Sequence, residues 1–261
     1  MKTVILAGGF GTRLSEYTNL IPKPMVEIGE IPILMHIINW YRGFNYTDFI
    51  VATGYKSEMI NDYFQDLLNS KDQEFNFITG ERKQLSKIKK ELKVKTIYSG
   101  LDSMTGGRLL SIEKFIDDED FMITYGDGLS NIDLNKLIKF HYSHKKIATI
   151  TAVRPNARFG ALNIKDNKVT SFREKKQLDQ GWVNGGFFIF NKRIFNYIEN
   201  KSTVLEKEPL ETLAKENQLM AYKHDGFWQC MDTKRDRDYL QELWLSGNPP
   251  WISKKKDLTS L

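Results

Sequence analysis

The sequence is poor in cysteine and histidine and has no long apolar run. A single cysteine, Cys230, excludes an internal disulfide and suits a reducing compartment, so we expect a cytoplasmic protein. The longest apolar runs fall well short of the roughly 20 residues that a membrane span needs, and we expect no membrane partner. The four histidines lack the spacing of a metal or catalytic site. No segment resembles an RNA-recognition or zinc-finger signature, so we expect no nucleic-acid partner.

Acidic residues are slightly fewer than basic ones, and the formal net charge is +5. A basic balance suits anionic substrates or nucleic acid. Lysine runs at residues 87–90 and 254–256 favour the simpler interpretation that the excess is a solvated surface. A hydrophobic content of 41% excludes a disordered chain, and 261 residues suffice for one large domain. The chain has neither an internal repeat nor a linker rich in proline, glycine and serine.

The first half of the chain alternates strand and helix patterns. Short apolar runs predict strands at residues 2–7, 48–53, 94–98 and 121–125. Apolar stripes at helical spacing predict helices at residues 32–41, from Ser57, and from Asn131 or Asp133. Because strands that alternate with helices pair through right-handed crossovers, we predict an α/β fold. Its sheet should be mainly parallel, Rossmann-like and mixed, with helices on both faces.

The pattern changes after about residue 147. We predict strands at residues 148–153, 182–190 and 219–223, helices near 192–198 and 209–216, and a closing helix at 234–245. Two further strands, 161–164 and 169–172, flank Asp166-Asn167, a pair typical of a hairpin turn. We expect one domain over residues 1–250, followed by a C-terminal tail over residues 251–261.

A glycine-rich segment, Gly8-Gly9-Phe10-Gly11-Thr12-Arg13, directly follows the first predicted strand. In open α/β sheets, ligands bind beyond the carboxyl ends of the strands. Glycines there let backbone N–H groups approach phosphates, and an arginine can fork onto phosphate oxygens. The spacing is neither a dinucleotide-binding fingerprint nor a P-loop. Taken alone, the segment is also compatible with a tight turn that binds nothing.

The longer run from Leu6 to Leu14, followed by Pro22-Lys23-Pro24, resembles the N-terminal signature of the sugar-phosphate nucleotidyltransferase family. The resemblance extends over nearly the whole chain. It implies the fold of nucleotide-diphospho-sugar transferases, a requirement for Mg²⁺, a nucleotide-binding half (residues 1–150) and a sugar-phosphate-binding half (residues 151–250). It also implies that Arg13 and Lys23 are catalytic. The residues it implies in nucleotide binding are Leu6, Ala7, Gly8, Gly9, Gly11, Thr12, Arg13, Ser103, Thr105, Arg108 and Gly126.

Residues 102–109, 124–128 and 226–233 resemble one branch of this family. That branch makes CDP-glucose and pyrophosphate from CTP and glucose 1-phosphate, for deoxysugar and surface polysaccharide biosynthesis. Residues 103–108 fall where the family reads the base, so they bear on a preference for cytosine. The alternative interpretation of this segment is a loop and a helix start, with Thr105 as the cap and Gly106-Gly107 as a turn.

Two aspartates are candidate metal ligands. Asp127 follows a predicted strand between two glycines, which exposes its carboxylate at the edge of the sheet. Mg²⁺ in proteins binds one or two carboxylates together with substrate phosphates. Asp232 matches the second metal ligand of the family. Its alternative role is that of N-cap for the helix from Lys234, and the two roles are compatible.

The resemblance places the sugar phosphate on two segments of the second half. Glu174 should accept sugar hydroxyls and Lys175 should bind the phosphate, although Lys176 replaces the usual proline. Asn184 and Gly185 match the family's sugar-binding segment, where two glycines in a strand also suit close approach of a ligand to the backbone. The alternative for these glycines is a β-bulge. The sequence departs from close relatives at two further positions. It has Ile21 where they often have a lysine and Cys230 where they often have a proline.

The expected reaction is attack by a phosphate oxygen of the sugar phosphate on the α-phosphorus of CTP. It requires no general base, because the phosphate monoester is largely a dianion near neutral pH. One alternative is a different sugar or polyol phosphate, or a different NTP. Others are a catalytically idle homologue that binds nucleotide sugar, and an NAD-dependent oxidoreductase, which the glycine spacing disfavours. By resemblance, we expect a homo-oligomer.

Overall fold

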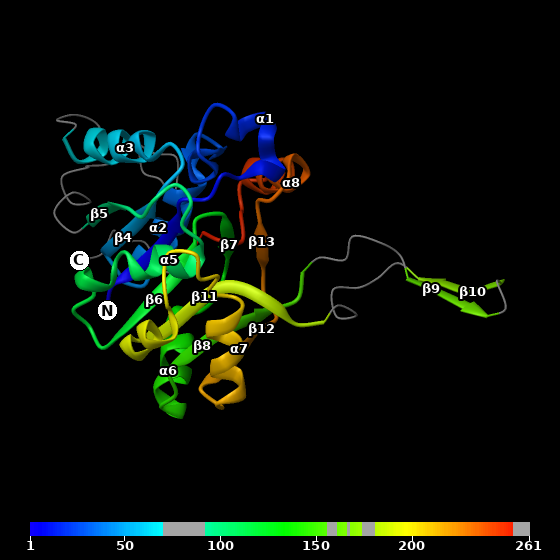
Figure 1. Cartoon of the computed structure of the whole chain (residues 1–261). Coiled ribbons are helices and arrows are strands. Elements are labelled where there is room, and N and C mark those ends of the chain that lie inside the picture. The colour runs from blue at the N-terminus through cyan, green and yellow to red at the C-terminus, as the bar shows by residue number, and fades with distance from the viewer. Residues whose placement is uncertain (70–91, 156–160, 166–167, 174–180, 253–261) are drawn as a thin grey trace, which may run out of the picture.

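A seven-stranded sheet forms the centre of the molecule in the computed structural model, which describes residues 1–69, 92–155, 161–165, 168–173 and 181–252 (Figure 1). The strand order is β12-β8-β11-β6-β1-β4-β5. All neighbouring pairs are parallel except those of β11, which runs antiparallel to both β6 and β8. The predicted mainly parallel, mixed sheet is therefore confirmed. The strand bounds are β1 (Thr3–Ala7), β4 (Asp48–Thr53), β5 (Lys93–Tyr98), β6 (Asp120–Tyr125), β8 (Ala148–Val153), β11 (Val183–Asn191) and β12 (Leu219–His224).

Helices cover both faces of this sheet. Alternate strand residues point to opposite faces, so Ile5 belongs to one apolar core whereas Val4 and Leu6 belong to the other. The first core is closed by α2 (Ile33–Arg42), α3 (Ser57–Asn69), α6 (Leu134–His144) and α8 (Lys234–Leu245). The second is closed by α5 (Thr105–Leu110), α7 (Glu208–Lys215) and the 3-10 helix η5 (Lys192–Tyr197). The remaining short helices are η1 (Thr12–Leu14), α1 (Ser15–Thr18), η2 (Lys23–Met25) and η3 (Glu113–Phe115).

Three two-stranded ribbons accompany the central sheet. The sequence did not predict β2 (Glu27–Ile28) with β3 (Ile31–Pro32), nor β7 (Gly128–Ser130) with β13 (Trp228–Cys230). Strands of two or three residues are too short for a period of two to show in the sequence. The third ribbon, β9 (Ala161–Lys165) with β10 (Lys168–Arg173), is the predicted antiparallel pair, and its turn at Asp166-Asn167 lies outside the described residues.

Two helix starts resolve alternatives that the sequence left open. Asp133, not Asn131, caps α6, since its carboxylate accepts from the backbone N–H groups of the first turn. Thr233, not Asp232, caps α8, and Asp236 completes a capping box with Thr233. The carboxylate of Asp232 is therefore free of a capping role and available for other contacts.

The chain end also differs from the expected tail. Trp251, placed in the tail by the sequence analysis, is 2% exposed and belongs to the first core. Its Nε1–H donates to Nδ1 of His36 on α2 at 3.1 Å, because the buried imidazole offers an acceptor there. Residues 253–261 lie outside the described part. Among the described residues, no helix is both long and apolar enough to cross a membrane.

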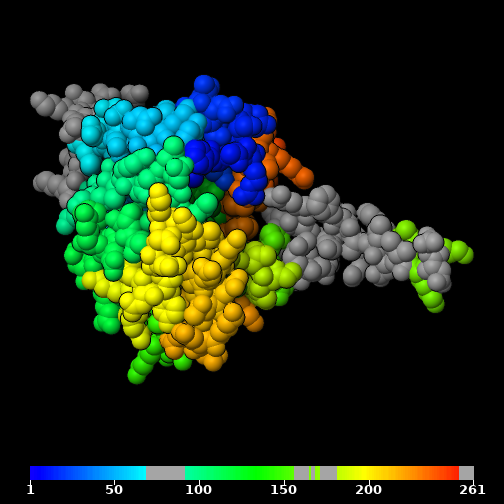
Figure 2. Space-filling view, viewed as in Figure 1, coloured from blue at the N-terminus to red at the C-terminus, as the bar shows by residue number. Residues whose placement is uncertain are grey.

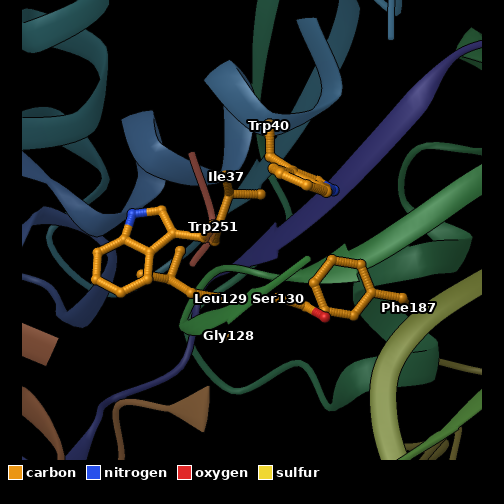
Figure 3. A pocket seen from close by; sticks show the side chains of 7 residues that line it. All are labelled: Ile37, Trp40, Gly128, Leu129, Ser130, Phe187 and Trp251. Carbon is orange, nitrogen blue, oxygen red and sulfur yellow. The ribbon is translucent and has the colours of Figure 1, made fainter. Parts of the chain in front are cut away.

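A small gap remains between α2, β7, β11 and Trp251 (Figure 3). The gap is too narrow to hold a water molecule. The rings of Trp40, Phe187 and Trp251 face it, and its hydroxyl, that of Ser130, already donates to the carbonyl of Phe227 at 2.8 Å. None of the described residues that line the gap is charged, so we interpret it as imperfect core packing rather than as a reaction site.

Candidate active site

The candidate site lies where the strand order reverses. From β1 the chain proceeds to β4 and β5 on one side and then returns to β6 on the other side of β1. Such a switch point leaves a crevice beyond the carboxyl ends of the two central strands. Here the crevice is bordered by the glycine-rich loop after Ala7 and by Gly126 and Asp127 after β6. The N–H of Gly126 donates to the carbonyl of Leu6 at 3.0 Å and holds the two loops together.

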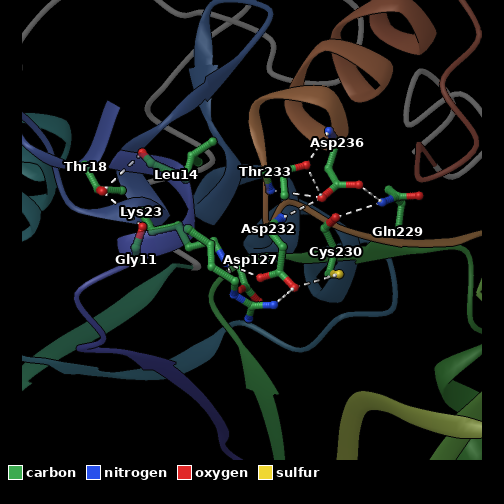
Figure 4. Close-up of polar contacts among 11 residues, drawn as sticks. Gly11, Leu14, Thr18, Lys23, Asp127, Gln229, Cys230, Asp232, Thr233 and Asp236 are labelled. Atoms are coloured by element: carbon green, nitrogen blue, oxygen red, sulfur yellow. Dashed lines mark hydrogen bonds and ion pairs between the residues drawn. The ribbon is translucent and has the colours of Figure 1, made fainter. Parts of the chain in front are cut away.

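The glycine-rich loop is held by Thr18, a residue that the sequence analysis missed. Its hydroxyl contacts the carbonyls of Gly11 and Leu14 at 3.0 and 3.1 Å (Figure 4). Gly11 has a φ of +66°, and a Cβ there would lie 2.8 Å from Thr18 Cγ2, so glycine is required for both reasons. By contrast, a Cβ on the exposed Gly9 would meet no atom within 4 Å. The backbone at Gly9 thus faces open space, as a phosphate-binding loop requires.

Two predicted cations and two predicted metal ligands meet beside this loop (Figure 4). The ammonium of Lys23 lies 2.6 Å from Asp127 Oδ2 and 2.7 Å from Asp232 Oδ1. Arg13 Nη1 lies 2.9 Å from the other oxygen of Asp232. The side chain of Lys23 is 11% exposed and that of Arg13 is 72% exposed. The cluster therefore has a buried cation at its centre and a solvent-exposed cation at its entrance.

The charges in this cluster stabilise one another. Burial lowers the pKa of Lys23, but the carboxylates of Asp127 and Asp232 outweigh burial and hold that pKa above its ordinary value. Burial raises the pKa of Asp232, but the hydrogen bond and charge of Lys23 and the charge of Arg13 hold it below its ordinary value. Both Lys23 and Asp232 are consequently charged at neutral pH.

Asp232 is positioned by the residues on either side of it. The carboxylate of Asp236, 6% exposed, accepts from the backbone N–H groups of Asp232 and Thr233 at 3.2 and 2.9 Å. The Cys230 thiol donates to Asp232 Oδ2 over 3.6 Å. Burial, followed by the nearby aspartates, raises the pKa of Cys230 to about 12, so the thiol is a donor and not a nucleophile. The Thr233-x-x-Asp236 spacing is a capping-box pattern that could have revealed Asp236 from the sequence.

The segment expected to read the base is held by bonds within the protein. Arg108 is 5% exposed, and its Nη1 donates to Ser99 Oγ at 2.9 Å and to the Gly100 carbonyl at 2.8 Å. Ser103 Oγ donates to the Ser99 carbonyl at 2.5 Å. The Arg108 guanidinium lies against the glycine-rich loop, since a Cβ on Gly8 would be 2.0 Å from its Nη1. Arg108 is thus close to the expected nucleotide loop, and Ser103 bonds the Ser99 carbonyl beside it.

Thr105 is not the helix cap that the sequence analysis offered as an alternative. Met104 is the N-cap of α5, and no side chain caps that helix. The Thr105 hydroxyl instead donates to Glu206 Oε2 at 2.6 Å. Gly107 is required by packing rather than by a turn, because a Cβ there would lie 2.1 Å from the Lys201 carbonyl oxygen.

The predicted sugar-binding residues are placed in part. The pairing register shifts between Asn184 and Phe188, at the paired glycines of β11, as a bulge there would require. The carbonyl of Gly185 accepts from Trp228 Nε1 at 2.7 Å, and Asn184 Oδ1 accepts from the N–H of Gly186 at 2.8 Å. Glu174 and Lys175, and the substitution at Lys176, lie outside the described residues.

The donor set at the aspartates fits a hard divalent cation. Within residues 1–69, 92–155, 161–165, 168–173 and 181–252, no three side chains of histidine, cysteine, aspartate or glutamate form a metal-binding group. A metal held here would take Asp127 and Asp232, with substrate phosphates and water as its other ligands, which is the coordination that Mg²⁺ accepts. Both carboxylates already converge on one cation, the Lys23 ammonium.

Known proteins match this chain over nearly its whole length. The model of the nucleotidyl transferase family matches residues 2–241. Glucose-1-phosphate cytidylyltransferases of Salmonella typhimurium and Salmonella typhi are each 47% identical over 253 residues, which cover 96% of this chain and 98% of those proteins. A solved structure of UDP-glucose pyrophosphorylase complexed with UDP-glucose has the same fold, with a TM-score of 0.69, 16% identity, and coverage of 94% of this chain and 98% of that one. The chain belongs to the nucleotidyl transferase family.

Proposed function

We propose that this enzyme transfers CMP from CTP to α-D-glucose 1-phosphate and releases CDP-glucose and pyrophosphate. The observation that carries the proposal is the convergence of Asp127 and Asp232 on Lys23 beside a glycine-rich loop at the switch point of the sheet. The choice of substrates rests on the cytidylyltransferase relatives that match the full chain. A site of this kind suits two anionic phosphate substrates and a metal.

The reaction makes one bond and breaks one. A phosphate oxygen of glucose 1-phosphate attacks the α-phosphorus of CTP, and the bond from that phosphorus to the bridging oxygen of pyrophosphate breaks. The attacking group is already largely a dianion near neutral pH, since its second pKa is about 6. No general base is needed. The protein has to hold two mutually repelling anions in position and neutralise their charge.

The cations of the cluster supply this neutralisation. Lys23 is central and nearly buried, which suits contact with the reacting phosphates, and the exposed Arg13 can fork onto phosphate oxygens at the entrance. Asp127 and Asp232 would hold Mg²⁺, which supplies charge neutralisation on the phosphates as a Lewis acid when bound. Arg13 and Lys23 then exchange their aspartate partners for phosphate oxygens.

The remaining predicted residues divide between the two substrates. The backbone from Leu6 to Thr12 and Gly126 border the crevice and would bind the nucleotide. Asn184 and Gly185, from β11, would bind the sugar. Glu174 and Lys175 are proposed for the sugar hydroxyls and its phosphate on resemblance alone.

A substrate panel tests the proposal. Pyrophosphate release is measured with CTP, UTP, dTTP, ATP and GTP, each against several sugar 1-phosphates, in the presence of Mg²⁺. We expect CTP with glucose 1-phosphate to give the highest kcat/KM. We also expect discrimination against UTP on the order of 100-fold, because a site that hydrogen-bonds the cytosine amino group leaves buried groups unpaired with uracil. Equal kcat/KM for CTP and UTP would remove the cytosine assignment, and no release with any pair would remove the enzyme assignment.

A further inference from the structure

Glu206, in the turn before α7, joins segments that are far apart in the sequence. Its Oε2 accepts from the Thr105 hydroxyl at 2.6 Å, and its Oε1 accepts from the Tyr125 hydroxyl. Tyr125 is the last residue of β6, two positions before Asp127. Among the residues that the structure describes, no lysine or arginine forms an ion pair with Glu206. A half-buried carboxylate that accepts from two hydroxyls is a fixed point for those hydroxyls.

The hydrogen bonds continue from Tyr125 to the predicted sugar-binding strand. Asn184 Nδ2 donates to the Tyr125 hydroxyl oxygen at 3.4 Å, and Asn184 Oδ1 accepts from the N–H of Gly186 at 2.8 Å. In this series of hydrogen bonds, each group donates to the next one in the direction of Glu206. The orientation of the Asn184 amide is thereby defined, and its second N–H remains to donate to another group.

Packing leaves the Tyr125 ring little room to adopt another position. Gly186 has a φ of +78°, and a Cβ there would lie 2.5 Å from Tyr125 Cδ2. The ring also packs edge-to-face against Phe188, with the centroids 5.7 Å apart. Contacts on the ring and a carboxylate at its hydroxyl together hold the phenol in one place, so loss of the carboxylate would loosen its hydroxyl end.

The chain around Glu206 also fixes the predicted base-reading segment. The N–H of Met104 donates to the Lys201 carbonyl at 2.9 Å, and the N–H of Gly106 donates to the Thr203 carbonyl at 3.0 Å. The Leu205 N–H donates back to the Thr105 hydroxyl at 2.9 Å. Residues 201–206 therefore form a rigid support, with Glu206 at its end that faces Tyr125.

We propose that Glu206 is a positioning residue for the sugar phosphate, holding the Tyr125 phenol and, through it, the Asn184 amide in the orientation that binds the sugar. This inference rests on the proposed function of the site. Glu206 acts through the other two side chains and does not itself touch the reacting atoms. Its removal should weaken binding of the sugar phosphate more than it slows turnover, and should affect CTP little.

The test compares Glu206→Gln with Tyr125→Phe and with the double variant. Glutamine keeps the shape of the side chain but turns an amide donor towards one of two hydroxyl donors. We expect Glu206→Gln to raise KM for glucose 1-phosphate about tenfold, with kcat and KM for CTP within about threefold of the wild-type values. Tyr125→Phe should give a similar rise. The double variant should add little to either single change, because the two act through one chain of hydrogen bonds.

Glu208→Gln is the matched control, because Glu208 is an exposed glutamate two positions away that opens α7. Its kinetics should equal those of the wild type. Unchanged KM for glucose 1-phosphate in Glu206→Gln, or fully additive effects in the double variant, would overturn the inference. If Glu206→Gln fails to fold, Tyr125→Phe with unchanged KM would overturn it as well. If the wild type prefers another sugar phosphate, the proposed substrate is wrong, and the same variants are compared with the preferred one.

Discussion

Cys230 pairs with Gly128 across the β7–β13 ribbon, and this register brings Asp232 beside Asp127. Asp127 immediately precedes β7, and its carbonyl accepts from the N–H of Met231 at 2.8 Å. The ribbon is antiparallel, so the residue before one strand lies close to the residues after the other. The two carboxylates that share Lys23 are thus brought together by three residue pairs outside the main sheet.

Asp232→Asn separates the metal role from a structural role. Thr233 caps α8 and Asp236 holds the backbone of Asp232, so the variant should keep its fold, with a melting temperature lowered only by the weakened ion pairs to Lys23 and Arg13. Activity should fall at least tenfold, because one of the two carboxylates available to Mg²⁺ loses its charge. Raised Mg²⁺ should restore part of it. The measurement is activity against Mg²⁺ concentration, together with thermal unfolding.

Two further variants complete this comparison. Asp127→Asn should show the same Mg²⁺ dependence as Asp232→Asn. Asp236→Ala should instead lower the melting temperature, because it leaves the partly buried N–H groups of Asp232 and Thr233 without this acceptor. A normally folded, fully active Asp232→Asn enzyme would exclude Asp232 from the metal site.

Lys23→Met tests whether the ammonium competes with a metal. In the free protein, Lys23 lies between the two carboxylates. Its removal should raise the pKa of Asp232, because burial is then less opposed, and should leave two carboxylates without their shared cation. We expect binding of Mn²⁺ to the enzyme without nucleotide to tighten about tenfold, while turnover falls at least tenfold. Binding is measured by titration calorimetry, with the exposed Lys136 on α6 changed to methionine as the control.

Opposite changes in binding and turnover are the decisive feature of this prediction. If Lys23 only supported the fold, the variant would bind Mn²⁺ more weakly, turn over more slowly and melt at a lower temperature. Weaker Mn²⁺ binding in a folded Lys23→Met enzyme would contradict the view that the ammonium occupies the place of the metal.

The sequence predicted the long elements of the fold well. The bounds expected for residues 48–53 and 148–153 are those of β4 and β8, because buried strands read as continuous apolar runs. It could not predict β7 and β13, whose pairing depends on the tertiary fold and not on a local period. The sequence also offered Asp232 as the cap of the last helix where the structure has Thr233, since both residue types cap well.

The sequence predicted site residues only where they belong to a motif or follow a predicted strand. The resemblance supplied Lys23 and Asp232, the positions of Arg13 and Asp127 after predicted strands pointed to them as well, and the structure brings these four together. Glu206 lies in no motif that the sequence analysis recognised. Its importance arises from contacts between residues about 80 and 100 positions apart, which no spacing rule describes.

Gly8→Ala and Gly9→Ala form a matched pair in the glycine-rich loop. A Cβ on Gly8 would lie 2.0 Å from Arg108 Nη1, and the guanidinium is buried and held by several carbonyls, so it cannot move without losing hydrogen bonds. We expect Gly8→Ala to cost about 2 kcal/mol of unfolding free energy. Gly9→Ala should keep its stability, since its Cβ would stand in open space, but should raise KM for CTP. Denaturant unfolding and steady-state kinetics distinguish the two, and equal stabilities would contradict the proposed contact with Arg108.

The last prediction concerns stability against pH. His36 is buried, its Nε2 lies 2.8 Å from the Ile28 carbonyl, and its Nδ1 accepts from Trp251. Burial lowers the pKa of His36 from its ordinary value of 6.5 to about 4. Burial also lowers the pKa values of His141, His144 and His224. All four histidines therefore bind protons more readily in the unfolded chain than in the folded one.

The sign of the effect follows from this difference. Above pH 6.5 His36 is neutral in both states, and its contribution to stability is fully present. Between pH 6.5 and 4 only the unfolded chain takes up the proton, so the free energy of unfolding falls by about 1.4 kcal/mol per pH unit from His36 alone. Below the folded-state pKa of about 4 both states are protonated and the loss levels off. The variant His36→Gln cannot titrate at this position but keeps one donor and one acceptor. Its free energy of unfolding, measured with urea at pH 7, 6 and 5, should therefore fall less steeply with falling pH than that of the wild type. The difference in slope is the contribution of His36, because the other three histidines still contribute in both proteins. Equal slopes for the variant and the wild type would mean that His36 takes up its proton at the same pH in the folded and unfolded protein, and would exclude the lowered folded-state pKa of the imidazole that joins Trp251 to the core.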